Sequence, residues 1–233
     1  MNAGSRDRIL ARIRAANRPV SRAHGTPAGA EHADRATDAA YAALPRTYLR
    51  AHHDAAAHDI AALFAERAAD YRAIVERVPG PDLAAAVARV LAERASALPG
   101  PVVVPEGLPG GWLAGLPAGI ALARDEPPLS AAELDQAAGV ITGCAVAVAE
   151  TGTIILDHGP GQGRRALTLV PDFHLVVVQA AQVAADLADA FARLDPARPH
   201  TLISGPSATS DIELIRVEGV HGPRNLHILL TDP

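Results

Sequence analysis

The sequence predicts an α/β fold in which helices cover both faces of a mainly parallel sheet. Short runs of β-branched and other apolar residues recur along the chain, and amphipathic segments with helical spacing lie between several of them. Of the 233 residues, 49% are hydrophobic, which is enough for one sizeable core but not for two full-sized domains. We therefore expect one main domain, over residues 46–233.

The first 45 residues differ from this body in composition. Residues 5–17 carry apolar side chains at helical spacing among several arginines, which predicts a basic amphipathic helix, with Ser5 as its N-cap, in a detached segment 1–17. Residues 18–45 are rich in Pro, Gly, His, Ala and Asp without sustained periodicity. That composition is typical of a flexible or extended arm.

Hydrophobic periodicity divides the body into alternating elements. The candidate helices are the stripe from Ile60 to Tyr71, the segment from Asp82 to the residues before Pro99, a short helix opened by the capping box Ser130–Glu133, and the segment marked by Val183, Leu187, Phe191 and Leu194. The candidate strands are AIVERV, VVV at 102–104, VITGCAVAVAE, TIILD, LTLV, HLVVV, TLISG and LHILL. Residues 105–125 are rich in Gly and Pro, which predicts short strands and turns.

Charge and cysteine content exclude several functional classes. The formal net charge is −5, so no overall positive field would attract a nucleic acid. Cys144 is the single cysteine, so the chain alone cannot supply the four thiolates usual for an iron–sulfur cluster.

His52, His53 and His58 lack a metal-ligand pattern, and no metal site is predicted. We find no secretory signal and no apolar run of membrane-spanning length, and we expect a cytoplasmic location.

The segment SGPSATSDIE, residues 204–213, combines hydroxyl side chains with a predicted helix start. It follows the strand TLI, and Ser210 and Glu213 have the spacing of a capping box. Free backbone N–H groups at such a start favour an anion. The expected ligand-binding residues are Ser204, Gly205, Pro206, Ser207, Thr209 and Asp211. The alternative is that these hydroxyl groups only cap the helix and satisfy the turn.

A single carboxylate interrupts the apolar run VAVAETGTIIL. A buried acid at this place must be paired, hydrogen-bonded or functional. Glu150 is therefore a candidate nucleophile, general base or orienting group, with Thr151, Gly152 and Thr153 as candidate ligand-binding residues. The alternative is a structural carboxylate that accepts hydrogen bonds from Thr151, Thr153 or Arg165.

Two arginines and two histidines complete the candidate site. Arg164 and Arg165 follow the loop GPGQG, and their planar guanidinium groups are suited to bind an anion. The spacing of GPGQG is wrong for a dinucleotide fingerprint, so no nicotinamide cofactor is predicted. His174 is a candidate ligand-binding residue and His221 a candidate catalytic residue, because imidazole transfers protons near neutral pH. An exposed rim for the arginines and a structural role for each histidine remain the alternatives.

The order of these motifs resembles the lactate utilization protein C family, whose members carry a LUD domain. The resemblance rests on ITGCAVAVAETGTIIL, GRRALTLVPDFHLVVV and HTLISGPSATSDIELIRVEGVHGPRNLHILL. It implies a fold related to sugar-phosphate isomerases and CoA-transferases, and a role in the oxidation of L-lactate to pyruvate. It also implies partner proteins that supply iron–sulfur clusters and cysteine-rich modules, while this chain binds no cofactor of its own.

Three functional hypotheses follow. In the first, the chain is a subunit of a lactate-oxidising system that binds a small carboxylate or organic phosphate. In the second, it is an independent isomerase- or CoA-transferase-like enzyme that acts on a phosphorylated or thioester substrate through Glu150. In the third, it is a non-catalytic assembly subunit whose N-terminal helix docks a partner. The sequence does not decide whether the chain is itself an enzyme or whether it forms a homo-oligomer.

Overall fold

The computed structural model describes residues 3–16, 40–45, 53, 59–97, 100–209, 217–218 and 221–232. The chain divides into two units, Met1–Tyr48 and Leu49–Pro233, which we describe separately. In the first unit the predicted leading helix is present as α1 (Ala3–Ala16). Because α1 begins before Ser5, the prediction of Ser5 as its N-cap is wrong. Most of the predicted arm 18–45 lies outside the described residues.

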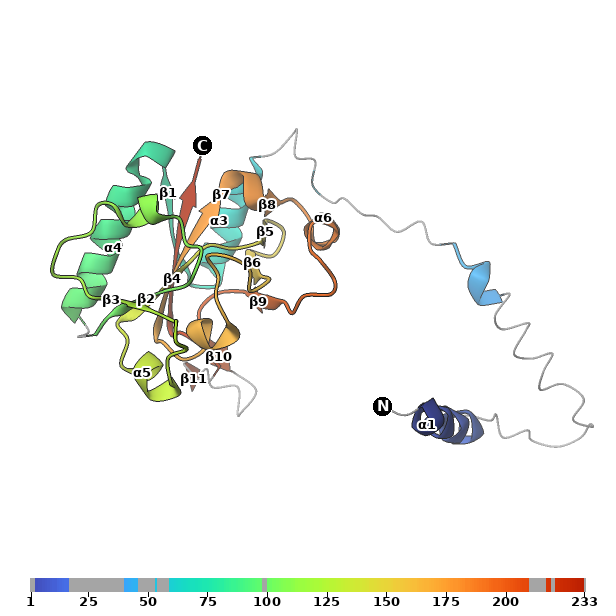
Figure 1. Ribbon diagram of the computed structural model, residues 1–233. Coiled ribbons are helices and arrows are strands. Elements are labelled where there is room, and N and C mark those ends of the chain that lie inside the picture. The colour runs from blue at the N-terminus through green and yellow to red at the C-terminus, as the bar shows by residue number, and fades with distance from the viewer. Residues whose placement is uncertain are drawn as a thin grey trace, which may run out of the picture. The chain divides into compact units, whose positions relative to one another are not determined.

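The second unit is built on a six-stranded sheet whose described strand pairs are all parallel (Figure 1). In spatial order the strands are β1 (Ile74–Val78), β12 (Asn225–Thr231), β7 (Phe173–Gln179), β4 (Gly139–Thr142), β2 (Val102–Val104) and β3 (Leu122–Arg124). The inner strands are apolar along nearly their whole length because both of their faces are buried. The predicted parallel α/β sheet is confirmed.

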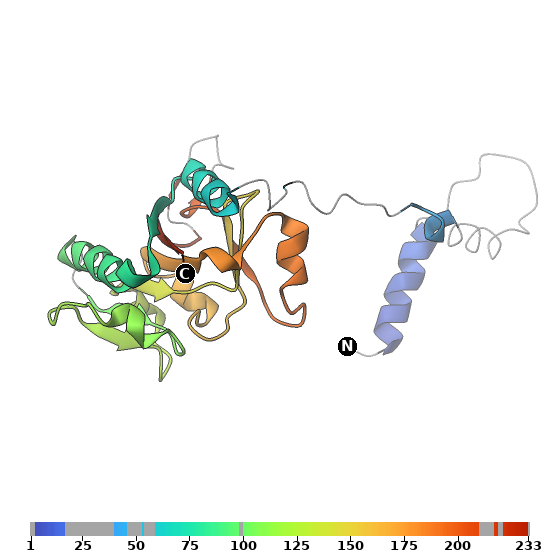
Figure 2. The same cartoon turned by 90° about the horizontal axis from the view of Figure 1, so that it is seen from above.

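Helices pack on both faces of this sheet (Figures 1 and 2). On one face, α4 (Leu83–Ala97) contacts the central strands through Val87 and Leu91. On the other face, α3 (Ile60–Asp70) contributes the fully buried Phe64, and α5 (Ala131–Asp135) contributes Leu134. The other short helices of this unit are η1 (Gly80–Asp82), η2 (Gly110–Leu113), η3 (Arg165–Thr168), η4 (Ala180–Gln182) and α6 (Leu187–Ala192). Among the described residues, no helix has both the length and the apolar character needed to span a membrane.

A second, smaller sheet of four strands was not separated from the first by the sequence analysis. Its spatial order is β8 (Val183–Ala184), β5 (Val146–Val148), β6 (Thr153–Leu156) and β9 (Thr201–Ile203). Apolar side chains of β5 and β6 alternate between the main core and a separate cluster with α6. This sheet brings the AETGT turn and the SGPS loop close together, since β6 pairs with β9.

Three predicted elements differ from the structure. The candidate strand VITGCAVAVAE is divided between β4 and β5, which belong to different sheets. LTLV was predicted as a strand, but it lies in the 3-10 helix η3 (Arg165–Thr168) and the following turn. Leu167 in η3 is fully buried, whereas Leu169, just after η3, is 40% exposed, although two residues at this spacing would share one face of a strand. The predicted helix that includes Val183 is split, because Val183 belongs to β8 and α6 begins at Leu187.

The predicted helix start at Ser210–Glu213 lies outside the described residues. Immediately before it, β10 (Ala208–Thr209) forms an antiparallel pair with β11 (Val217–Glu218). After β9 and the SGPS loop, the chain therefore forms a short strand before the predicted helix start.

Candidate functional site

Several predicted site residues meet at one cavity of about 220 Å³, which we call the Arg165 cavity. Four segments that are distant in sequence form its walls: the 3-10 helix η3, the start of β7, the loop after β9 and the segment before β12. The predicted residues among its lining are Arg165, His174, Ser204, Gly205, Pro206, Ser207 and His221. The cavity lies at the amino ends of β7 and β12, whereas ligands of open α/β sheets usually bind at the carboxyl ends.

Backbone contacts hold two of these walls together. The N–H group of Ser207 donates to the carbonyl oxygen of Pro223 (2.8 Å), and the N–H group of His221 donates to Oγ of Ser207 (3.1 Å). Gly205 has a φ of 77°, and a Cβ atom there would lie 2.5 Å from the carbonyl oxygen of Tyr71. The SGPS loop can thus approach the end of α3 only because residue 205 is glycine.

No carboxylate among the described residues forms an ion pair with Arg165. Its Nη1 donates to the carbonyl oxygen of Thr168 (3.0 Å) and to Oγ1 of the same residue (3.3 Å). Among the described residues that line the cavity, none is Asp or Glu. The walls therefore combine a guanidinium group, two imidazoles and hydroxyl donors, an arrangement suited to an anion.

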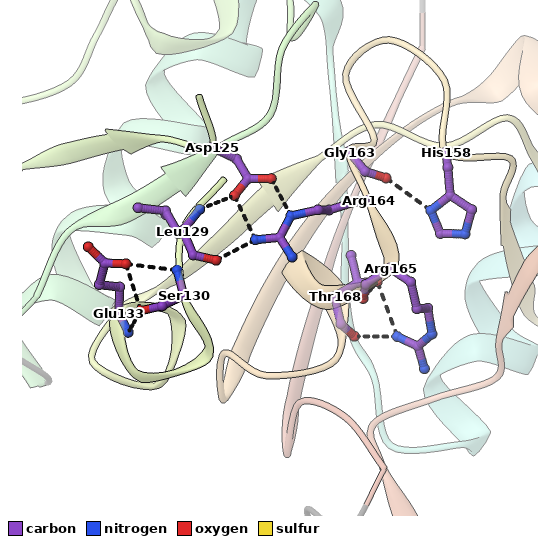
Figure 3. A network of polar contacts seen from close by, with 9 residues as sticks. All are labelled: Asp125, Leu129, Ser130, Glu133, His158, Gly163, Arg164, Arg165 and Thr168. Atoms are coloured by element: carbon purple, nitrogen blue, oxygen red, sulfur yellow. Dashed lines mark hydrogen bonds and ion pairs between the residues drawn. The ribbon is translucent and has the colours of Figure 1, made fainter. Parts of the chain in front are cut away.

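Arg164 and Arg165 are adjacent in sequence but have different surroundings (Figure 3). Arg164 donates from Nε and Nη2 to the two carboxylate oxygens of Asp125 (2.7 and 2.9 Å), and from Nη2 to the carbonyl oxygen of Leu129 (2.6 Å). These hydrogen bonds hold the pKa of the Asp125 carboxyl below its usual range. Of the two predicted arginines, only Arg165 lines the Arg165 cavity.

The AETGT motif lies beside the cavity and is joined to it by hydroxyl groups. Oγ1 of the buried Thr153 lies 2.7 Å from Oγ1 of Thr151 and 2.8 Å from Oγ of Ser204. Thr151, Gly152 and Thr153 do not line the cavity themselves, but this chain of hydroxyl groups ends at Ser204 in its wall. The motif therefore positions the wall rather than forming it.

Glu150 is not part of the cavity lining. It is half-buried, and its backbone N–H group donates to the carbonyl oxygen of Ala185 (3.1 Å). The alternative in which its carboxylate accepts from Thr151, Thr153 or Arg165 is not seen among the described residues: the two hydroxyl groups bond to each other, and Arg165 donates to Thr168. Asp211 lies outside the described residues, and only the backbone of Thr209 is described.

Comparison with known proteins identifies the family. A model of the LUD domain matches residues 128–231, a range that contains every described residue lining the Arg165 cavity. A protein named lactate utilization protein C from Deinococcus radiodurans is 49% identical over 171 residues, which are 72% of this chain and 77% of that protein. The chain belongs to the lactate utilization protein C family.

Other proteins similar to this chain have lower sequence identity. Lactate utilization protein C from Bacillus pumilus is 35% identical over 107 residues, 42% of this chain and 44% of that protein. An uncharacterized Escherichia coli protein, YkgG, is 32% identical over 119 residues, 46% of this chain and 51% of that protein. The crystal structure of a DUF162 family protein from Deinococcus radiodurans has a TM-score of 0.61 and 40% identity, and the match covers 74% of this chain and 96% of that chain. This structure confirms the α/β fold of the LUD domain.

Among the described residues that line the Arg165 cavity, His174 is the most deeply buried polar one. Its side chain is 1% exposed, and Nε2 lies 2.7 Å from Oγ1 of Thr142 at the end of β4. Burial, together with the nearby charge of Arg165, lowers the pKa of this imidazole to about 3. His174 is therefore neutral at physiological pH. Sequence reasoning missed Thr142, whose signal is a lone hydroxyl at the end of an apolar strand.

We expect His174 to weaken the LUD domain at acid pH. The folded-state pKa of about 3 lies below the usual value of 6.5. Between these values the imidazole of the unfolded chain is protonated, whereas the imidazole of the folded chain is not. The free energy of unfolding should then fall by up to about 1.4 kcal/mol per pH unit between these two values. Urea denaturation from pH 4 to 7 should show a steeper loss for the wild type than for His174→Gln. Parallel pH profiles would contradict this origin.

Cys144 and His53 have structural partners. Burial raises the pKa of the Cys144 thiol to about 12, and its Sγ donates to Oε1 of Gln182 (3.6 Å), as suits a core residue. His53 bonds to the buried Asp186 through Nδ1 (2.9 Å). The described part of the chain contains no group of three His, Cys, Asp or Glu side chains that would hold a metal ion.

Proposed function

We propose that this chain is a cytoplasmic subunit of a lactate-oxidising system that binds a small carboxylate or organic phosphate in the Arg165 cavity. One observation carries the proposal: Arg165, His174 and His221 line the same cavity, and none of its described lining residues is acidic. The relatives named lactate utilization protein C support the assignment to lactate metabolism.

The free edge of Arg165 gives the site its selectivity for anions. Thr168 occupies Nη1, which leaves Nε and Nη2 without a partner among the residues that the structure describes. This pair of N–H donors matches the two oxygens of a carboxylate or phosphate. A cavity of about 220 Å³ suits a small organic acid, since drug-sized ligands occupy about 300–1,000 Å³.

Electron transfer is assigned to partner proteins under this proposal. The only thiol of the chain, Cys144, is buried in the core and protonated, so it offers neither a redox pair nor a cluster ligand. Partners with iron–sulfur clusters and cysteine-rich modules would accept the electrons, while this chain holds the anion. An isomerase- or CoA-transferase-like reaction would need Glu150 at the ligand, and Glu150 does not line the cavity.

Two measurements test the proposal. In calorimetry with the full chain, we expect saturable binding of at least one of pyruvate, L-lactate and phosphate, and no binding of ethylammonium, a cation of similar size. In extracts of source cells, lactate-dependent reduction of an electron acceptor should disappear when the gene is deleted and return with the wild-type gene. Undiminished reduction after deletion would remove the role in lactate oxidation.

A further inference from the structure

His174 lines the Arg165 cavity, and one nitrogen of its buried ring is unsatisfied. Its side chain is 1% exposed, and its Nδ1 has no hydrogen-bond partner among the residues that the structure describes. Buried polar atoms in native proteins are nearly always hydrogen-bonded to protein, to ordered water or to a ligand. An unpaired ring nitrogen on a residue that lines a cavity therefore points to a group that binds in that cavity.

The partner of the other ring nitrogen indicates the tautomer of His174. A neutral imidazole has one donor and one acceptor nitrogen, and Nε2 is bonded to the fully buried hydroxyl group of Thr142. If Thr142 donates to Nε2, its hydroxyl hydrogen is satisfied and the imidazole proton resides on Nδ1. The opposite arrangement would leave the buried hydroxyl hydrogen without an acceptor among the described residues. Satisfaction of both groups thus favours an Nδ1–H donor.

We propose that the Arg165 cavity is specific for a 2-oxo carboxylate, whose carboxylate group pairs with Arg165 and whose keto oxygen accepts a hydrogen bond from Nδ1–H of His174. This inference rests on the proposed function, because it requires an anion at Arg165. A keto oxygen only accepts, which matches a lone donor. The hydroxyl oxygen of a 2-hydroxy acid can also accept from Nδ1–H, but its hydrogen needs a further acceptor that this nitrogen does not provide, and a simple carboxylate leaves the donor unpaired.

Because His174 is neutral, its contribution to binding does not depend on pH near neutrality. Burial and the charge of Arg165 hold the pKa of the imidazole near 3, so no proton is gained or lost between pH 5 and 8. A neutral donor also stabilises negative charge that develops on the keto oxygen of a bound acid. His221, in contrast, is exposed on the rim of the cavity.

Calorimetry with pyruvate, L-lactate, propionate and phosphate tests the specificity. We expect the wild type to bind pyruvate about tenfold more tightly than propionate, which lacks the oxygen at C2. His174→Phe should reduce this preference to less than twofold while propionate affinity stays within about twofold of the wild-type value. His227→Gln is the matched control, because His227 is also buried but lies outside the cavity, and it should keep the preference.

Nitrogen NMR of the histidine-labelled wild type tests the same inference without a variant. We expect the His174 signals of a neutral ring with the proton on Nδ1, unchanged from pH 5 to 8 and shifted by pyruvate. A proton on Nε2, or equal affinities for pyruvate and propionate, would overturn the specificity and leave anion binding at Arg165 intact. Tighter binding of phosphate than of pyruvate would also overturn it. Failure of all four anions to bind would contradict the proposed function as well.

Discussion

Gly152→Ala is expected to lower the free energy of unfolding by about 3 kcal/mol or more, the largest stability effect that we predict for a single methyl group. Gly152 has a φ of 59°, and a Cβ atom there would lie 2.4 Å from the backbone nitrogen of Ala68 and 2.5 Å from the carbonyl carbon of Arg67. Both atoms belong to the backbone of α3, so the helix itself would have to move.

Gly119→Ala is the matched control for this substitution. Its added Cβ atom would meet nothing within 4 Å, and Gly119 does not have a positive φ. We expect its free energy of unfolding to change by less than about 1 kcal/mol. Urea denaturation of the two variants and the wild type measures the difference, and similar midpoints for all three would show that the AETGT turn does not pack on α3 as described.

Arg165→Gln is expected to reduce the affinity for pyruvate by about thirtyfold, because the guanidinium group is the charged partner of the bound anion under the proposed function. Arg164→Gln removes the same formal charge from the neighbouring residue. Arg164→Gln breaks the exposed pair with Asp125. Its affinity for pyruvate should stay within about twofold of the wild-type value, and its free energy of unfolding should fall by about 1 kcal/mol or less. Calorimetry and urea denaturation of both variants give the comparison. Equal losses of affinity would mean that overall charge, not the position of Arg165, controls binding.

Much of the parallel sheet could be predicted from sequence because its inner strands are short, β-branched and buried on both faces. β2, β7 and β12 follow this rule, and each was predicted. LTLV has the same apolar composition, but the prediction of a strand there was wrong. Its conformation depends on side-chain contacts of η3, in which Thr168 bonds back to Arg165, and those contacts leave no trace in hydrophobicity.

The candidate site was less predictable because its geometry depends on residues far away in the sequence. Arg164 and Arg165 are equivalent by composition, and Asp125, 39 residues before Arg164, distinguishes them in the fold. Burial of His174 follows from its apolar strand, but the state of its ring depends on Thr142 in a neighbouring strand, 32 residues away. Glu150 was predicted as a site residue from its apolar sequence neighbours alone. These neighbours do not indicate on which side of the β5–β6 pair its side chain lies.

The central position of β12 has a consequence for biosynthesis. β12 lies between β1 and β7, and Ile74 of β1 pairs with His227. During synthesis on the ribosome, β1 therefore has no partner strand until residues near 231 have been added. Pairing of strands so far apart in the sequence is slow. His221 and Pro223 of the cavity immediately precede β12, so the walls of the Arg165 cavity and the sheet are completed in the same late step.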